Sequence, residues 1–339
     1  DALCSWLSNN KFSYKKIFWV TGVIAFFLSP IADNLTTALI LGTVVLVVGK
    51  GNKNFITIGM INIVVAANAG GAFSPFGDIT TLMVWQRGFV SFFDFFAIFI
   101  PSVVNYIIPA VIMSLFISNR IPQGDGKKVT ILPGGKIIAL LGISTIIITV
   151  TGHQVLHMPP IFGMMFGLGL LGTFGYFLKK NATEKNKFDI FVLTGKAEWD
   201  TLLFFYGILV AVGGLASLGY LKLISDDMYV NLGPTYANIL VGILSAIIDN
   251  IPIVYAVLTA HPSMDMGQWL LITLTAGVGG SLLSIGSAAG VALMGQARGQ
   301  YTFFSHLKWS WAILLGYAAS IVTHLWMNAS LFDNIPLAR

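Results

Sequence analysis

Apolar segments fill this chain and leave few charged residues between them. The segments are 17–30, 35–48, 55–69, 79–85, 89–118, 136–151, 159–178, 201–218, 236–248, 252–260, 269–283, 288–294 and 309–330. Some are as long as the roughly 20 residues that an α-helix needs to cross a bilayer. Only 10% of the residues are charged, whereas a soluble domain has about 25%. The sequence therefore predicts an all-α polytopic membrane protein embedded in a lipid bilayer.

The amino-acid composition also excludes several kinds of site and function. The single cysteine, Cys4, excludes an intramolecular disulfide and any metal site built from several Cys ligands. The net charge of +5 comes from residues in the polar loops, so we expect no nucleic-acid binding. No His/Cys cluster indicates a transition metal. We expect a protein that is not an enzyme and that has no cofactor.

Two pairs of short apolar segments each meet at an Asp-Asn dipeptide. The first pair surrounds Asp33-Asn34, and the second surrounds Asp249-Asn250. Segment 17–30 would span only about 21 Å as a helix, less than a bilayer core. Irregular backbone at membrane depth is tolerated only where protein or a watery cavity satisfies it. We therefore predict re-entrant hairpins over 17–48 and 236–260.

A glycine- and serine-rich interruption follows each hairpin. It reads GGAFSPFGD over 70–78 and GGSLLSIGS over 279–287. Both contain Gly-Gly, a spacer, Ser, and then Gly followed by a side chain with an oxygen atom. We predict broken transmembrane helices over 55–86 and 269–298. The repeated order of hairpin and broken helix indicates an internal duplication.

The distribution of positive charge predicts how the two repeats are oriented. Cytoplasmic loops are enriched in Lys and Arg. If the first hairpin returns to its own side, all Lys and Arg except Arg87, Lys222 and Arg339 fall on one side. The repeats are then inverted, a common plan for secondary transporters. We expect a first repeat at 1–118, with a long span at 89–118, then a cytoplasmic loop at 119–135. The second repeat covers 136–330, with scaffold spans over 136–218 and a last span at 309–330.

Buried carboxylates are the residues with the clearest chemical meaning. Asp33 and Asp249 lie in the two Asp-Asn dipeptides, and Asp78 ends the first interruption. No Lys or Arg lies within the adjoining apolar segments to neutralise them. A charged side chain at membrane depth costs about 2.5–3.5 kcal/mol even on the most lenient scale. Such a carboxylate must be protonated, bind a cation or face water. These three positions therefore suit a site that holds either H⁺ or a metal cation.

Neutral oxygen donors surround the three carboxylates. They are Ser29, Asn34, Thr36, Asn68, Thr80, Thr81, Asn250, Ser284 and Ser287. Hard cations prefer carboxylate, amide, hydroxyl and carbonyl oxygens. Burial disfavours a charged carboxylate and an adjacent cation favours it, so protons and Na⁺ compete for such a site. Our hypothesis is that Asp33 and Asp249 bind Na⁺ or H⁺, that Asp78 assists, and that the protein exchanges the two ions.

Several of these residues also have simpler interpretations. Asp33, Asp78 and Asp249 could each cap the helix that follows. Asp94 is expected at the membrane interface, and Asn68 could simply hydrogen-bond a neighbouring helix. His324 lies in the last span, where packing is the simpler role and proton transfer the alternative. The other histidines, His306 among them, are expected in loops or at the interface.

Four stretches of the chain resemble the NhaD-type sodium/proton antiporters of the ion transporter superfamily. They are SPIADNLTTAL at 29–39, GGAFSPFGDITT at 70–81, SAIIDNIP at 245–252 and the run 284–298. The motifs are long, and the likeness covers essentially the whole chain. Members of this family have further helices upstream of the first hairpin, so the resemblance implies that this chain is a fragment.

The resemblance implies export of Na⁺ or Li⁺ against entry of H⁺ across the bacterial inner membrane. It also implies a scaffold and a transport domain in each half and, often, a homodimer. Functional importance carries over to Ser29, Asp33, Asn34, Asn68, Asp78, Thr80, Thr81, Asp249, Ser284 and Ser287.

Other functions fit the sequence less well. An arsenite or dicarboxylate carrier of the same superfamily is the main alternative, although an anionic substrate would be repelled by Asp33 and Asp249. An intramembrane aspartyl protease would need a Gly-x-Gly-Asp pattern, and Asp78 instead follows SPFG. A channel would not need two inverted hairpins.

Overall fold

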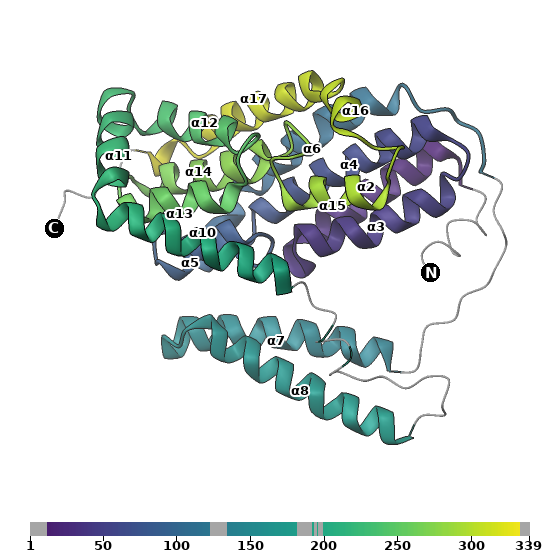
Figure 1. Ribbon diagram of the computed structural model, residues 1–339, viewed down its shortest axis with the longest axis horizontal. Coiled ribbons are helices and arrows are strands. Elements are labelled where there is room, and N and C mark those ends of the chain that lie inside the picture. Colours follow the sequence, from purple (N-terminus) through teal and green to yellow (C-terminus); the bar gives the residue numbers. More distant parts are fainter. Residues whose placement is uncertain (1–11, 123–133, 182–191, 193–194, 196–198, 333–339) are drawn as a thin grey trace. The chain divides into compact units, whose positions relative to one another are not determined.

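The computed structural model describes residues 12–122, 134–181, 192, 195 and 199–332. Every regular element in these ranges is a helix, which confirms the predicted all-α class (Figure 1). The chain divides into two compact units, one built from 3–127 and 208–339 and the other from 128–207. Most of the predicted 119–135 loop, including its lysines Lys127 and Lys128, lies outside the described residues.

The larger unit contains the elements of both predicted hairpins and both broken helices. From the first part of the chain it has α2 (Tyr14–Ala32), α3 (Asn34–Val48), α4 (Lys53–Ala72), α5 (Ile79–Gln86), η1 (Phe92–Ile98) and α6 (Phe99–Ser114). From the second part it has α11 (Tyr220–Asn231), α12 (Pro234–Leu244), α13 (Asn250–Ala260), α14 (Met266–Gly279), α15 (Ala288–Gln296), α16 (Phe303–Leu307), α17 (Ser310–Met327) and η3 (Ala329–Leu331).

The smaller unit consists mainly of two helices that pack against each other, α7 (Gly135–Leu156) and α8 (Pro160–Asn181). Helix α10 (Trp199–Ser217) crosses the boundary between the units. These three helices lie within 135–218, and their role as the scaffold spans expected over 136–218 stays a prediction.

Six helical stretches of the described chain are long and apolar enough to cross a membrane. They are Tyr14–Ala32, Lys53–Ala72, Phe92–Ser114, Gly135–His153, Pro160–Lys180 and Ser310–Met327. Four further apolar helices are shorter, namely α3, α12, α13 and α14. The protein is therefore a multi-pass membrane protein that also contains helices too short to span.

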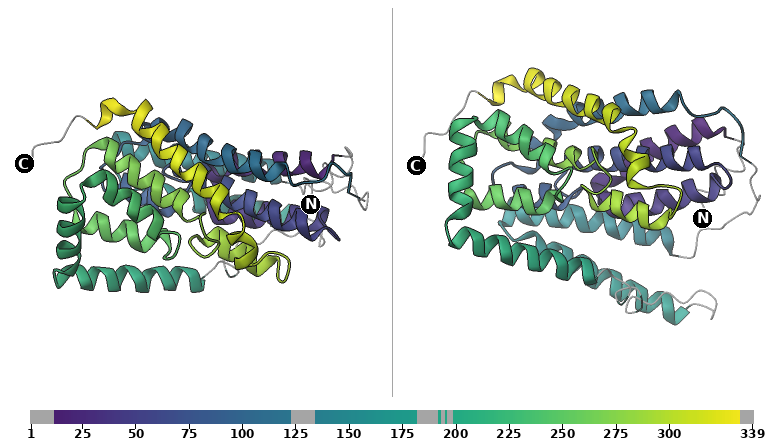
Figure 2. Two further views of the ribbon diagram at one scale, coloured as in Figure 1. Left: turned by 90° about the horizontal axis from the view of Figure 1, so that it is seen from above. Right: turned by 45° about the horizontal axis from the view of Figure 1, so that its top comes forward.

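Helices α4 and α14 form the core of the larger unit. Every residue from 58 to 72 and from 267 to 279 is buried. The two helices pack against each other, and α4 also contacts α2, α3 and α6 (Figure 2). A helix apolar on all sides is stable only when protein or lipid surrounds it entirely. This packing holds the interruption that follows each helix inside the protein.

Helices α2 and α3 pack against each other on either side of Asp33, but α2 is longer than expected. It has 19 residues, because Ser13 caps it, so that it begins three residues before the apolar run, and because it continues past Pro30 to Ala32. Only α3 is too short to span, so the expectation of two short arms is wrong for α2. In the second hairpin both arms, α12 and α13, have 11 residues, and both are short as predicted.

One helix was missed, because no apolar segment was predicted between 218 and 236. The structure has α11 there, running crosswise at the ends of several other helices (Figures 1 and 2). The helix packs against α12 and α13. Its Tyr229 is buried and donates a hydrogen bond of 2.9 Å to Asn238 Oδ1. Charged residues at 226 and 227 concealed the helical spacing of Leu221, Ile224 and Met228.

Equivalent contacts recur in the two hairpin and broken-helix pairs. Four residues before the Asp of each tip, a serine hydroxyl donates to a carbonyl of the next helix: Ser29 to Ala67 at 2.7 Å and Ser245 to Ala276 at 2.9 Å. A Cβ on Gly70 would lie 2.1 Å from the Phe26 carbonyl oxygen, and one on Gly279 would lie 2.0 Å from that of Gly242. These matched contacts agree with duplication, while the inverted orientation stays a prediction.

We predict that Gly70→Ala and Gly279→Ala each reduce stability strongly, because the added methyl group would collide with backbone that has no room to move. Overpacking costs about 1–3 kcal/mol or more. Thermal unfolding of purified protein in detergent measures the loss. Gly142→Ala on α7 is the control, since its Cβ would meet nothing within 4 Å. Equal melting temperatures for all three variants would contradict the close backbone contact.

Candidate functional site

Asp78 ends the first interruption and begins α5. Its backbone is extended, and its Oδ1 accepts a hydrogen bond of 3.0 Å from Thr80 N. The capping interpretation of Asp78 is therefore correct. The residue is only 6% exposed, so its second carboxylate oxygen also needs partners within the protein.

Those partners come from both hairpin tips. Asp78 Oδ2 accepts a hydrogen bond of 2.8 Å from Asn34 Nδ2 and one of 2.9 Å from Asn250 Nδ2. Asn34 and Asn250 are the second residues of the two Asp-Asn dipeptides, and they are far apart in the sequence. Hydrogen bonds to an ionised acceptor are about twice as strong as neutral ones. One carboxylate oxygen therefore joins the two predicted hairpins.

Asn68 extends this network to the second interruption. Its Oδ1 accepts from Asn34 Nδ2 at 3.2 Å, and its Nδ2 donates to Ser281 Oγ at 2.8 Å. Asn68 is 1% exposed and Ser281 is fully buried. The expectation that Asn68 hydrogen-bonds a neighbouring helix is therefore correct, and its partner lies in the other interruption.

Asp33 occupies a strained position at the first hairpin tip. Its φ of 56° is in the left-handed region that a residue other than glycine rarely adopts. Its carboxylate accepts hydrogen bonds from Thr36 N at 2.9 Å and from Thr36 Oγ1 at 2.8 Å, which caps α3. Thr36 thus holds the Asp33 carboxylate, and its part in ion binding stays a prediction. Strained backbone of this kind is common at functional sites.

Asp249 is held differently from Asp33. It precedes α13, and among the described residues its Oδ2 is buried with no hydrogen-bond partner. The hydroxyl of Thr37 is likewise buried and has no partner in the described part of the chain. Buried polar atoms normally have a partner, such as an ion or water. These oxygens have lone pairs that a cation could use.

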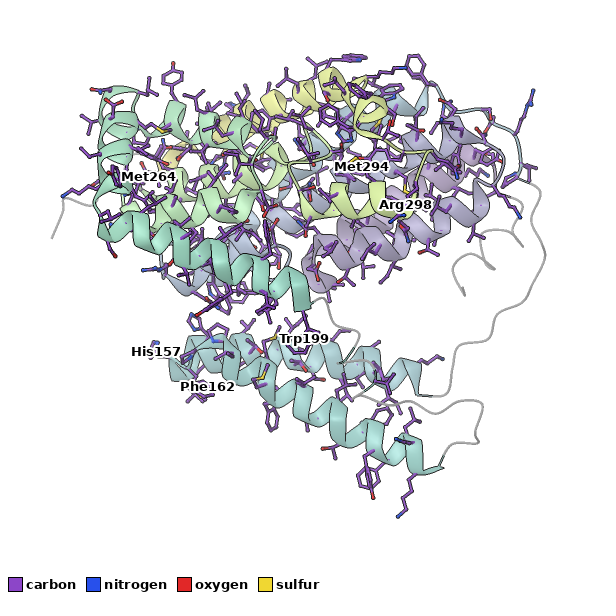
Figure 3. All side chains as sticks on the ribbon, in the orientation of Figure 1. His157, Phe162, Trp199, Met264, Met294 and Arg298 are labelled. Carbon is purple, nitrogen blue, oxygen red and sulfur yellow. The ribbon has the colours of Figure 1, made fainter. Side chains whose placement is uncertain are left out.

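The other predicted residues support the local backbone. Thr81 Oγ1 donates to the Asp78 carbonyl at 2.7 Å, and Ser29 joins α2 to α4 as described above. Ser287 caps α15 by accepting from Gly290 N at 3.3 Å. Ser284 donates to the sulfur of Met294 at 3.2 Å, a residue of α15 that is labelled in Figure 3. None of these four hydroxyls hydrogen-bonds a carboxylate in the described contacts.

The electrostatic character of the site is negative. Asp33 and Asp249 each lie within electrostatic range of Asp78. In the described part of the chain, no three His, Cys, Asp or Glu side chains come together in a way that could hold a metal ion. A cation here would therefore use one or two carboxylates together with neutral oxygens, which suits a weakly bound alkali ion better than a transition metal.

Sequence reasoning missed two buried residues beside the site. His306 was expected in a loop or at the interface, but it is fully buried and its Nε2 lies 2.8 Å from the Ser281 carbonyl oxygen. Tyr301, 1% exposed, contacts His306 Nδ1 at 2.7 Å. The polar context of 299–308 concealed this burial. Asp94, by contrast, caps η1 through Ser91 and takes no part in the site.

Comparison with known proteins gives a consistent result. A family model described as citrate transporter matches residues 1–277. The Na(+)/H(+) antiporter NhaD of Alkalimonas amylolytica is 55% identical, over 98% of this chain and 74% of the relative. The antiporter of the same name from Vibrio cholerae is 53% identical over the same shares. Sodium/proton antiporter 1 of Arabidopsis thaliana is 35% identical, over 92% of this chain and 55% of the relative.

We predict that Asp78 couples energetically to both asparagines. Asn34→Ala and Asn250→Ala should each cost about 1–3 kcal/mol, because each removes a hydrogen bond to a charged group. In an Asp78→Ala background the Asn250 change should cost much less, since its acceptor is already gone. Double-mutant cycles from unfolding titrations in detergent measure the coupling.

Asn54→Ala provides the control for this cycle. Its Nδ2 donates to the Phe116 carbonyl at 3.2 Å on an exposed surface, so its effect should add to that of Asp78→Ala. If Asn250→Ala also adds simply to Asp78→Ala, the shared-acceptor geometry is wrong.

Proposed function

Because this chain belongs to the citrate transporter family and, within it, to the NhaD-type sodium/proton antiporters, we propose that it exchanges Na⁺ or Li⁺ for H⁺ across a membrane. The observation that carries the proposal is Asp78 Oδ2, which accepts hydrogen bonds from the tips of both hairpins at 2.8 and 2.9 Å. A carboxylate in that position interacts electrostatically with any charge that appears or disappears at either tip.

The chemistry of the donors favours an alkali cation. Asp33 and Asp249 lie within electrostatic range of Asp78, and Asp249 Oδ2 has no hydrogen-bond partner among the described residues. Oxygen ligands of this kind suit hard cations. Na⁺, Li⁺ and H⁺ are the transported species in this proposal, and no cofactor takes part.

Exchange follows if one site holds either a cation or a proton but not both. In this proposal Asp33 and Asp249, one at each tip, are the carboxylates that bind Na⁺ and H⁺ in turn. Asp78 connects the two tips. Cation binding at a tip favours ionised carboxylates, and its departure favours protonation. A site that changes its access to the two sides of the membrane only when loaded would then move Na⁺ and H⁺ in opposite directions.

Citrate or another carboxylate is a weaker candidate despite the description of the family model. A polyanion would have to bind beside three carboxylates, and like charges oppose one another strongly in a low-dielectric site. The hydrogen-bond partners found for Asp33 and Asp78 are asparagine and threonine groups, with no Lys or Arg among them. Arsenite would be carried as a neutral hydroxide, which the carboxylates would not repel, so it remains the alternative substrate.

We further propose a bacterial inner-membrane location, inverted repeats and a homodimer. The positive-charge asymmetry of the sequence and the matched contacts at Ser29 and Ser245 support the first two. The homodimer rests on the family resemblance alone.

The central test measures Na⁺-induced proton release from everted vesicles of a bacterial strain that lacks its own antiporters. Na⁺ or Li⁺ should dissipate the pH gradient with the wild-type chain. Asp33→Asn, Asp78→Asn and Asp249→Asn should each lose about tenfold or more of this activity, since each removes a charge that the cation needs. Asp94→Asn is the matched control and should retain activity, because Asp94 only caps η1.

Two results would contradict the antiport proposal. One is a wild-type protein that is abundant in the membrane yet gives no response to Na⁺ or Li⁺. The other is full activity in all three site variants. Uptake of arsenite or of a labelled tricarboxylate would then be the next assay.

A finer prediction concerns the buried hydroxyl of Thr80, which lies beside the Asp78 carboxylate. Thr80→Val keeps the shape of the side chain but removes an oxygen, so the Na⁺ KM should rise about fivefold while the amount of folded protein stays similar. Thr323→Val on α17 is the control, because its hydroxyl donates to the Ala319 carbonyl of its own helix at 2.7 Å. Equal KM values for both variants would remove Thr80 from the cation site.

A further inference from the structure

A fully buried histidine lies outside the carboxylate site but is connected to it by hydrogen bonds. His306 belongs to α16 and has no exposed surface. Its Nε2 is 2.8 Å from the Ser281 carbonyl oxygen, and its Nδ1 is 2.7 Å from the Tyr301 hydroxyl. Both ring nitrogens therefore have partners inside the protein.

These partners determine the tautomer of His306. A carbonyl oxygen can only accept a hydrogen bond, so Nε2 must carry the proton that it donates to Ser281. In the neutral ring Nδ1 is then an acceptor, and the Tyr301 O–H donates to it. Tyr301 thus favours the tautomer that holds Ser281, which is the usual way in which a second partner orients an imidazole.

Ser281 connects His306 to the carboxylates. It lies in the second interruption, where its backbone carbonyl faces His306 and its hydroxyl accepts from Asn68 Nδ2 at 2.8 Å. Asn68 in turn accepts from Asn34, whose amide also donates to Asp78 Oδ2. The position of the Ser281 backbone therefore affects where Asn68 and Asn34 can lie.

We infer that His306, oriented by Tyr301, is a positioning residue that fixes the Ser281 segment of the second interruption and thereby holds Asn68 and Asn34 in place at the carboxylate site. The effect on transport rests on the proposed function, whereas the effect on the structure of the interruption does not. No proton passes along this route in the proposal, because Ser281 takes part through two different atoms that its backbone separates.

The chain contains a matched control for a purely structural role. His324 on α17 is also fully buried, its Nε2 lies 3.0 Å from the Gly267 carbonyl oxygen, and its Nδ1 lies 2.8 Å from Asn328 Nδ2. This geometry agrees with the packing interpretation of His324. Replacing either histidine by alanine removes a buried imidazole and leaves a carbonyl without its donor, but only His306 contacts the interruption.

The experiment compares His306→Ala, His306→Gln and His324→Ala in the full chain. Hydrogen–deuterium exchange of purified protein is followed in peptides that cover 68–78 and 279–287. We expect exchange in these peptides to be about tenfold faster in His306→Ala than in wild type, because a lost buried hydrogen bond costs about 1.4 kcal/mol. His306→Gln, which can still donate to Ser281, should restore slow exchange, and His324→Ala should leave these peptides unchanged.

Transport provides the second measurement. In everted vesicles, His306→Ala should raise the Na⁺ KM about tenfold, with a smaller change in maximal rate, and His306→Gln should recover most of this loss. His324→Ala should change protein abundance but not the KM. A KM and exchange pattern for His306→Ala that matches His324→Ala would overturn the inference.

The two proposals fail in different ways. If wild-type protein does not respond to Na⁺ or Li⁺, the antiport proposal fails, and the exchange data still decide whether His306 fixes the interruption. If wild type transports Na⁺ but His306→Ala shows normal exchange and a normal KM, antiport stands and the role of His306 is refuted.

Discussion

The arrangement of the site depends on one shared hydrogen-bond acceptor. Asp78 Oδ2 receives amide protons from Asn34 and Asn250, while Oδ1 caps α5. A buried carboxylate without partners is very costly, and these three donors offset that cost. Two of these donors come from the two hairpin tips. The hydrogen bonds that offset the cost of burying Asp78 therefore also determine where the two tips meet. Other contacts, such as Asn68 with Ser281, reinforce this meeting point.

The sequence was most informative where structure is determined locally. The Asp-Asn dipeptides, the Gly-Gly interruptions and the apolar segments correctly predicted short helices that begin directly after a carboxylate, namely α3, α5 and α13. Helix α2 was predicted too short because a single capping residue, Ser13, extends it into polar sequence. Helix α11 was missed because its apolar contacts with α12 and α13 are tertiary. Helix ends and amphipathic surface helices are set by partners that a linear pattern does not contain.

The carboxylate site illustrates the same limit. Its members could be listed from the sequence, since an unneutralised Asp in apolar sequence is conspicuous by its cost. Which of these residues hydrogen-bond to one another could not be predicted, because Asn250 and Asp78 belong to different halves of the chain. His306 could not be identified either, since nothing in the polar stretch around it indicates that the ring is completely buried. The contact between Asn250 and Asp78 and the burial of His306 both depend on how α4 and α14 pack in the core.

The close approach of backbone at Gly70 and Gly279 has a mechanical consequence. At each position the helix before an interruption touches a hairpin arm so closely that no side-chain atom lies between them. Surfaces in such contact cannot slide past each other without opening a void, and proteins avoid voids. The first arm of each hairpin is thus held tightly against the helix before the following interruption, α2 against α4 and α12 against α14. Any opening of the site to either side of the membrane has to move each of these two pairs as a unit.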